Sequence, residues 1–303
     1  MRKTSRLMLG LLVLLLAGCS NGPSRVNLAG GATLKQLPPS AAEPDVYSFG
    51  FDRRLDAAED VRMYVPFLQY LEGATGLRFK LYPSPRTESV VEALGNGRVH
   101  FAAIGALSYL QASKRHGVTA LVSANTDNGL QEYRSLLVTR PESDIRVLRD
   151  LQGRSLALGA PTSTQGNLIP RITLKQAGIE ISDLKMVQHH SSHFETANAV
   201  LSGRFDAGAI QDTLGRELAR RGVVRILHES APFPSSTISV SPRVPAEVAE
   251  VVKRALLEFQ PTGRHAAVLY RWDQSEMPLG FAPVNQEAME RVRVLAEEVG
   301  LLR

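Results

Sequence analysis

The chain has 303 residues, of which 44% are hydrophobic, and it contains a single cysteine. One cysteine excludes a disulfide within the chain, so stability has to come from an apolar core, and the length allows one large or two medium domains. The net charge of +5 is too small to indicate a nucleic-acid-binding protein, and no nucleic-acid partner is expected.

The first nineteen residues predict an exported, lipid-anchored protein. Three basic residues are followed by an apolar run from 7 to 16, which is too short to span a bilayer comfortably. Leu16-Ala17-Gly18-Cys19 resembles the bacterial lipobox, which implies cleavage after residue 18 and a lipid on Cys19. Removal of residues 1–18 also removes three positive charges, which lowers the net charge from +5 to +2. The alternative is an ordinary signal peptide that contains a cysteine.

Residues 19–44 are rich in Gly, Pro, Ser and Ala and predict a flexible tether. From Val46 onward, short apolar strands alternate with amphipathic helices, which predicts a mainly parallel α/β sheet. A strand ends at Gly50, and a helix with a capping-box pattern follows and runs to Gly73. Two such series, joined near 135–140 with a return near 235–240, suggest two lobes that enclose a cleft. We expect residues 45–135 and 236–303 in one lobe and 136–235 in the other.

The segment from Gly159 to Asn167 carries the strongest indication of a binding site. It lies between a predicted strand and a predicted helix, and it contains Ser163, Thr164 and Gly166. Main-chain N–H groups at a helix start, the positive end of the helix dipole and two hydroxyls can converge on one small oxyanion. The alternative is that Ser163 or Thr164 only caps the helix.

Other polar residues could complete such a site. His189, His190 and His193 could bind a metal, but no second ligand cluster stands out, and one histidine donating to an oxyanion is a simpler interpretation. Asp212 could accept a hydrogen bond from a P–OH group, which would select phosphorus oxyanions over sulfate. Tyr109 follows a predicted strand end and could also line the site. The other candidates are Asp206, which could instead pair locally, and Tyr133.

Several segments, taken in order, resemble the phosphate/phosphonate/phosphite-binding family of ABC-transporter substrate-binding proteins. The resemblance runs from about Tyr47 to about Phe281 and is carried by residues 91–102, 105–109, 133–135, 148–154, 161–166, 193–200 and 203–208. It implies a two-lobed periplasmic-binding-protein fold of the second type that closes over a small oxyanion. The direct ligands that it implies are the side chains of Ser163, Thr164 and His193 and main-chain donors from Gln165 and Gly166, with Tyr109 and Tyr133 lining the cleft.

The chain departs from the family pattern at three places. Gln165 stands where the family's loop usually has a second serine, and Arg86-Thr87 stand near the place of a missing tyrosine, where Arg86 could contact the ligand. The segment 230–235 also lacks an acidic residue for a ligand amine. The expected function is capture of phosphate, phosphite or a phosphonate for an ABC permease, on the periplasmic side of either membrane. A sensor or scavenger of the same fold and a periplasmic hydrolase are the alternatives; no enzymatic activity and no cofactor are expected.

Overall fold

The computed structural model describes residues 46–53, 57–83, 88–126 and 129–302. The predicted signal peptide, Cys19, the tether and Arg86 lie outside these residues. Within the described ranges, no helix combines the length and the apolar character needed to cross a membrane. Residues 44–303 form one compact unit.

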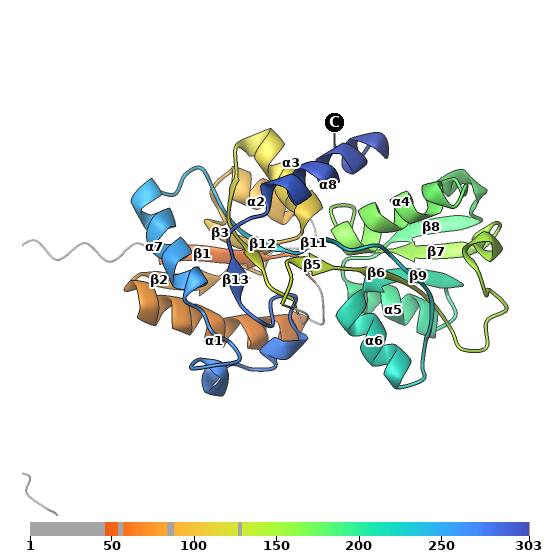
Figure 1. Ribbon diagram of the computed structural model, residues 1–303, viewed down its shortest axis with the longest axis horizontal. Helices are drawn as coiled ribbons and strands as arrows, with labels where there is room; N and C mark the ends of the chain where they lie inside the picture. Colours follow the sequence, from red (N-terminus) through yellow and green to blue (C-terminus); the bar gives the residue numbers. More distant parts are fainter. Residues whose placement is uncertain (1–45, 54–56, 84–87, 127–128, 303) are drawn as a thin grey trace, which may run out of the picture. The chain divides into compact units, whose positions relative to one another are not determined.

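A six-stranded sheet and a five-stranded sheet form the centres of two lobes (Figure 1). The strand order of the first sheet is β13-β4-β12-β3-β1-β2, and that of the second is β10-β6-β9-β7-β8. The strands of the first lobe are β1 (Val46–Phe51), β2 (Arg78–Leu81), β3 (Phe101–Ile104), β4 (Thr119–Ala124), β12 (Thr237–Val240) and β13 (Phe281–Ala282). Those of the second lobe are β6 (Ser135–Thr139), β7 (Ser155–Leu158), β8 (Met186–His189), β9 (Ala207–Gln211) and β10 (Arg225–Glu229).

Alternating side chains bury both faces of the first sheet. Phe49 and Phe101 pack on one face against the first and seventh helices, while Ala102 and Ile104 pack on the other against the second and third. This alternation is the period of two that strands impose on their side chains. The helices of this lobe are α1 (Ala57–Thr75), α2 (Val90–Gly95), α3 (Ala106–His116), α7 (Ala246–Leu257) and α8 (Gln286–Glu298).

The second lobe follows the same rule. Leu156 and Leu158 pack on the face that Leu174 covers, and Leu136 and Ile210 pack on the opposite face. Its helices are α4 (Ile169–Gln176), α5 (His193–Leu201) and α6 (Asp212–Arg220), and a π-helical turn, η2 (Thr164–Leu168), leads into α4. Short 3-10 turns are η1 (Leu148–Leu151), η3 (Ile181–Asp183), η4 (Ala266–Val268) and η5 (Trp272–Gln274).

The prediction of a mainly parallel sheet is wrong, because both sheets are mixed. β1 pairs in parallel with β2 and β3, but β12 is antiparallel to both β3 and β4. In the second lobe β6 is antiparallel to β9 and β10, while β7 is parallel to its two neighbours. The strands that break the parallel pattern include β6 and β12, the first strands formed after the chain has passed between the lobes. Each enters its new sheet from the opposite end.

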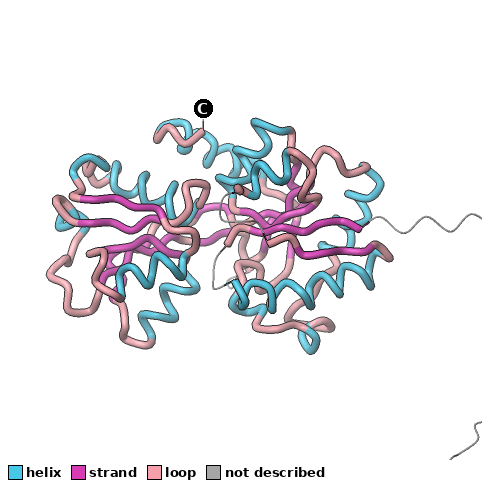
Figure 2. The backbone as a smooth tube through the Cα atoms, turned by 180° about the vertical axis from the view of Figure 1, so that it is seen from behind, coloured by secondary structure: helices cyan, strands magenta, loops and turns pink. Residues whose placement is uncertain are grey.

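Two crossover segments connect the lobes and pair with each other. β5 (Glu132–Tyr133) and β11 (Phe233–Pro234) form a short antiparallel ribbon in which Tyr133 lies opposite Phe233. Figure 2 shows the chain passing through this ribbon from one set of strands to the other. Tyr133 and Phe233 of this ribbon belong to an apolar cluster with Leu107 of α3, Ile169 of α4 and Val292 of α8. The C-terminal helix therefore contacts elements of both lobes.

Candidate functional site

The loop between β7 and η2 is a tight structure that depends on glycine. Ser163 is the N-cap residue, and its Oγ accepts a hydrogen bond of 2.9 Å from the main-chain N–H of Gly166. The N–H of Gly159 donates to the carbonyl of Gly166 at 2.8 Å, and a Cβ on Gly166 would lie 2.8 Å from the Cα of Gly159. Thr164 and Gln165 come next in the chain and begin the helix. Their N–H groups lie at the positive end of the helix dipole and have no acceptor within the helix.

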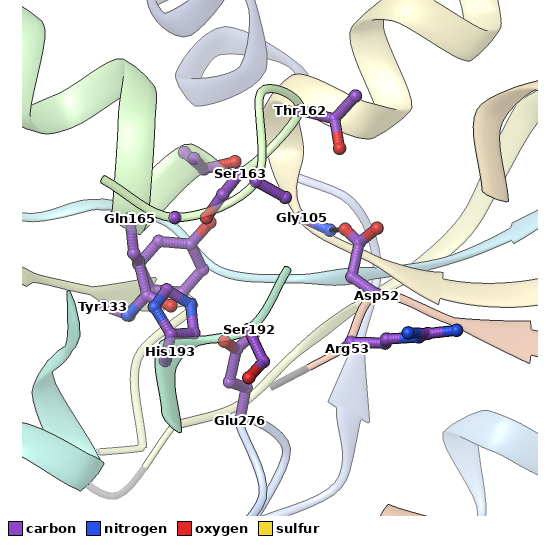
Figure 3. A pocket seen from close by; sticks show the side chains of 13 residues that line it. Asp52, Arg53, Gly105, Tyr133, Thr162, Ser163, Gln165, Ser192, His193 and Glu276 are labelled. Carbon is purple, nitrogen blue, oxygen red and sulfur yellow. Dashed lines mark hydrogen bonds between the residues drawn. The ribbon is translucent and has the colours of Figure 1, made fainter. Parts of the chain in front are cut away.

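This loop forms one wall of a cavity of about 40 Å³ that both lobes enclose. Because one water needs roughly 10–15 Å³, the cavity accepts a ligand of only a few heavy atoms. Figure 3 shows its lining side chains. The lining residues are Asp52, Arg53, Gly105, Tyr133, Gly159, Ala160, Thr162, Ser163, Thr164, Gln165, Ser192, His193 and Glu276.

The N-terminal end of α3 forms the opposite wall, and two of its main-chain donors, the N–H groups of Gly105 and Leu107, form hydrogen bonds within the protein. The carboxylate of Asp52 accepts hydrogen bonds from the N–H of Gly105 at 3.0 Å and from the hydroxyl of Ser108 at 2.9 Å. The N–H of Leu107 donates to Oγ1 of Thr164, in the other lobe, at 2.9 Å. The helix end of the first lobe therefore contacts the loop between β7 and η2 of the second lobe directly.

The charged groups at the cavity have both signs. Arg53 and the imidazole of His193 can supply positive charge or N–H donors, while Asp52 and Glu276 bring carboxylates. Glu276 is buried and accepts a hydrogen bond from the hydroxyl of Ser236. A cavity with two carboxylates favours a ligand that carries hydrogens to donate, since a ligand with acceptors alone would face two negative groups.

The structure brings five of the eight predicted ligand-binding residues to this cavity: Tyr133, Ser163, Thr164, Gln165 and His193. Ser163 is a cap as well as a cavity residue, and its hydroxyl hydrogen is not used by the cap, because the oxygen is the acceptor there. The two alternatives for this serine, cap or site, are therefore compatible.

The other three predicted residues lie outside the lining. Gly166 stabilises the loop from within, because its N–H donates to Oγ of Ser163 and is not available to a ligand. Tyr109 is in α3 and packs against apolar clusters of that helix, because its position in the helical turn directs the ring away from the cleft. Asp212 lines a neighbouring cavity of about 60 Å³, which also contains Tyr133 and Glu276.

The remaining histidines of the predicted cluster have other contacts. Nδ1 of His189 donates to the carbonyl of Gly159 at 2.6 Å, and the ring of His190 packs edge-on against Phe205. Burial and the nearby charge of Arg204 hold the pKa of His190 below its ordinary value. No group of three or more metal-ligating side chains is found in the part of the chain that the structure describes.

Sequence reasoning missed Asp52, Arg53, Ser192 and Glu276. Asp52 lies two residues after the end of the predicted first strand, and residues that follow a strand end at the edge of an α/β sheet often face a ligand cleft. Glu276 belongs to a loop far along the chain, and no local pattern distinguishes it from other acidic residues.

The chain matches the family model of the periplasmic substrate-binding protein of phosphonate ABC transporters over residues 49–289. It is 30% identical over 169 residues to a probable ABC transporter phosphite binding protein, PhnD1, of Prochlorococcus marinus, which covers 53% of this chain and 50% of the relative. It is 27% identical over 161 residues to the phosphate-import protein PhnD of Mycolicibacterium smegmatis, with 50% of each chain covered. This chain therefore spans about half the length of these curated relatives.

A solved structure supports the fold over a longer stretch. PhnD1 of Prochlorococcus marinus, in complex with methylphosphonate, matches with a TM-score of 0.75 and 18% sequence identity. The match covers 85% of this chain and 99% of that one. The fold is that of the two-lobed periplasmic binding proteins, and the family model extends over most of both lobes. The chain belongs to the family of periplasmic substrate-binding proteins of phosphonate ABC transporters.

Proposed function

We propose that the protein captures a small phosphorus oxyanion, namely phosphate, phosphite or a small phosphonate, and delivers it to an ABC permease. The observation that supports this most is the small cavity between the lobes, where a helix-opening loop meets the side chains of Ser163 and His193. N–H groups at the positive end of a helix, a hydroxyl and an imidazole form a donor set suited to an oxyanion. The proposed ligands are Ser163, Thr164, Tyr133, His193 and the N–H of Gln165.

The carboxylates favour phosphorus over sulfur. Phosphate, phosphite and phosphonate monoanions carry a P–OH group that can donate to Asp52 or Glu276. Sulfate and sulfonates at neutral pH have acceptors only, so they would meet these carboxylates without a hydrogen to donate. A ligand that bridges both walls of the cavity would also favour the closed arrangement of the lobes, which a permease can distinguish from the open one.

Replacement of Ser163 by alanine tests the loop's role. Loss of one hydroxyl donor to an anion is expected to weaken the binding of phosphate or methylphosphonate roughly 10- to 150-fold, because such a hydrogen bond is worth roughly 1.5–3 kcal/mol. Loss of the cap is expected to lower the free energy of unfolding by about 1 kcal/mol. Isothermal titration calorimetry and chemical denaturation measure the two effects separately.

Ser89 provides a matched control, because its side chain caps α2 in the same way and lies outside the cavity. Ser89→Ala should lower the free energy of unfolding by a similar amount and leave the dissociation constant unchanged. If Ser163→Ala binds the ligand as tightly as the wild type does, Ser163 is only a cap.

We also infer from the sequence that the protein is held at the periplasmic side of the cell envelope by a lipid on Cys19. A receptor on a tether of the predicted length could reach a permease without diffusing away. Cells grown with labelled palmitate should incorporate the label into the wild-type protein and not into Cys19→Ser. Equal incorporation in the two proteins would contradict the assignment.

A further inference from the structure

The side chain of Gln165 links the loop between β7 and η2 (residues 159–166), here named the oxyanion loop after its proposed role, to the crossover between the lobes. It is 2% exposed, and its amide nitrogen donates to the carbonyl of Arg134 at 2.9 Å and to Oδ1 of Asp212 at 3.2 Å. These two bonds use both hydrogens of the amide. The side chain of Gln165 therefore has no N–H left for a ligand, and only its main-chain N–H can serve one.

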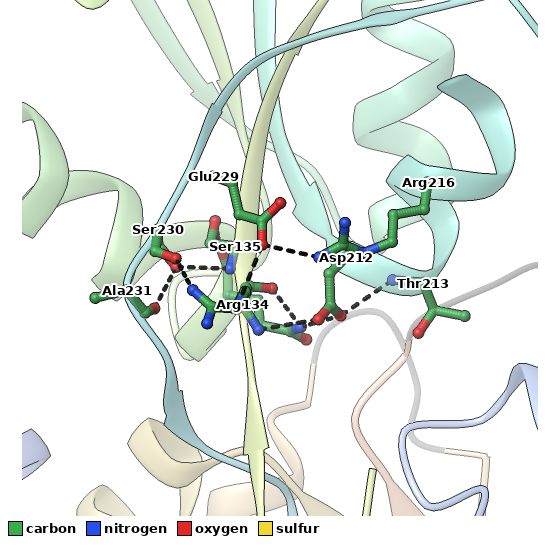
Figure 4. Close-up of polar contacts among 9 residues, drawn as sticks. Arg134, Ser135, Asp212, Thr213, Arg216, Glu229, Ser230 and Ala231 are labelled. Atoms are coloured by element: carbon green, nitrogen blue, oxygen red, sulfur yellow. Dashed lines mark hydrogen bonds and ion pairs between the residues drawn. The ribbon is translucent and has the colours of Figure 1, made fainter. Parts of the chain in front are cut away.

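The carboxylate of Asp212 is the acceptor that holds this link together. Besides Gln165, its carboxylate accepts hydrogen bonds from the N–H of Thr213 at 3.0 Å and from the N–H of Arg134 at 3.0 Å (Figure 4). Three N–H donors thus converge on one partly buried carboxylate at the start of α6. Such charge-assisted bonds are about twice as strong as neutral ones, so the carboxylate fixes the positions of all three donors.

Arg134 joins this link to both crossover segments. It lies between β5 and β6 on the outgoing segment, and its guanidinium donates to the carbonyl of Ser230 on the return segment at 2.7 Å. The N–H of Ser135 donates to Oγ of Ser230 at 3.0 Å, while the hydroxyl of Ser135 donates to the carbonyl of Gln165 at 2.6 Å. Opening and closing of the lobes requires backbone rotation in these two segments.

We propose that the side chains of Gln165 and Asp212 are positioning groups that couple the crossover segments to the oxyanion loop, and that neither side chain is itself a ligand. When the crossover bends, the carboxylate of Asp212 and the amide of Gln165 carry that movement to the loop. The N–H groups of Thr164 and Gln165 are aimed at the ligand only while this link is intact. The ligand-dependent part of this proposal rests on the proposed function.

The primary test is a double-mutant cycle on ligand affinity with inorganic phosphate and methylphosphonate as probes. Gln165→Met keeps the length of the side chain but removes both donors, and Asp212→Asn keeps the shape but replaces one acceptor by a donor. Each is expected to weaken binding about tenfold or more, and the double variant should be no more than about threefold weaker than either, because both break the same link. Additive losses would overturn the proposal.

Asp206 is the matched control. It is a carboxylate of the same lobe that accepts the N–H and the hydroxyl of Ser155, at 2.8 and 2.6 Å, away from the oxyanion loop. Asp206→Asn should destabilise the lobe and leave both dissociation constants within about twofold. Equal losses of affinity in Asp206→Asn and Asp212→Asn would show a general effect of lobe stability and would overturn the link.

Amide hydrogen exchange tests the link without any ligand. In the unliganded protein, Gln165→Met and Asp212→Asn should each accelerate exchange in the segment 163–168, and Asp206→Asn should not. Unchanged exchange in this segment would overturn the positioning role whatever the protein binds. If exchange responds as expected but the wild type binds no phosphorus oxyanion, the proposed function fails and the link stands.

The pH dependence gives a readout that a purely structural role would not move. Burial raises the pKa of Asp212 above its ordinary value, the N–H of Arg134 partly offsets this, and the charge of Glu276 raises it further. Protonation turns one acceptor oxygen into a donor, so at least one of the three N–H bonds is lost. The charged and titratable groups around Asp212 are Arg134, Arg216, Glu229, Glu276, Asp273 and Tyr133.

The signs of the two pH effects are opposite. Because the folded-state pKa is raised, the contribution of Asp212 to the free energy of unfolding is fully present below its unfolded pKa and is lost as the pH rises through the folded value. Affinity should instead fall on acidification. The ratio of wild-type to Asp212→Asn affinity is expected to shrink as the pH is lowered from neutral through the raised pKa of Asp212, and the titration of the ligand cancels in this ratio. A constant ratio would overturn the proposal.

Discussion

Replacement of Gly166 by alanine is expected to weaken the binding of a phosphorus oxyanion at least about 100-fold, which corresponds to about 2.8 kcal/mol. The added Cβ would lie 2.8 Å from the Cα and 3.1 Å from the main-chain nitrogen of Gly159. Both are main-chain atoms, so no flexible side chain can move aside, and the loop itself has to shift. The N–H groups of Thr164 and Gln165 would then no longer point toward the ligand.

The same substitution is expected to lower the free energy of unfolding by about 1–3 kcal/mol, the usual cost of overpacking. Gly73 in α1 is the matched control, because an added Cβ there would have no neighbour within 4 Å. Gly73→Ala should raise the free energy of unfolding by about 0.5–1 kcal/mol without changing affinity. Calorimetric titration of Gly166→Ala would contradict the site if its dissociation constant stayed within threefold of the wild type.

Replacement of Gly105 by alanine is expected to weaken binding about 30-fold, or about 2 kcal/mol, by opposing closure of the lobes. Gly105 has φ −69° and ψ 164°, which any residue can adopt, so alanine introduces no strain within the first lobe. The added Cβ would lie 2.9 Å from Oγ1 of Thr164, which belongs to the second lobe. The collision therefore exists only when the lobes are closed.

Removal of the opposing atom should relieve this effect. In Thr164→Ala the oxygen is absent, so the double variant should bind about as tightly as Thr164→Ala alone. Small-angle scattering with saturating phosphate should show Gly105→Ala in a more extended form than the wild type. Equal radii of gyration and equal affinities would show that this contact does not govern closure.

The oxyanion loop could be predicted from the sequence because its signals are local. Ser163, Thr164 and Gly166 lie within four residues at the junction of a strand and a helix, and the requirement for glycine follows from the close approach to Gly159. The alternation of strands and helices likewise indicated the two-lobed α/β class. The relative strand directions did not follow from it, because β6 and β12 owe theirs to the passage between lobes.

The side chains from the first lobe were harder to predict, because they meet the loop only through the tertiary fold. Asp52 and Glu276 reach the cavity from segments more than 100 residues away from Ser163 in the chain, on either side. Tyr109 follows a strand end, which indicates a place in the cleft, but the rotation of α3 places the ring in an apolar cluster. The acceptor role of Asp212 depends on donors from two distant segments, at Arg134 and Gln165, which no spacing in the sequence reveals.

The central claim, that the cavity takes a phosphorus oxyanion and rejects its sulfur analogue, is tested most directly by one calorimetric panel. The purified protein, freed of any co-purified ligand, is titrated with phosphate, phosphite, methylphosphonate, 2-aminoethylphosphonate and sulfate at neutral pH. At least one phosphorus ligand should bind, with an affinity at least about 100-fold above that for sulfate, since like-charge contacts cost several kcal/mol. Absence of binding by every phosphorus ligand, or an equal affinity for sulfate, would contradict the claim.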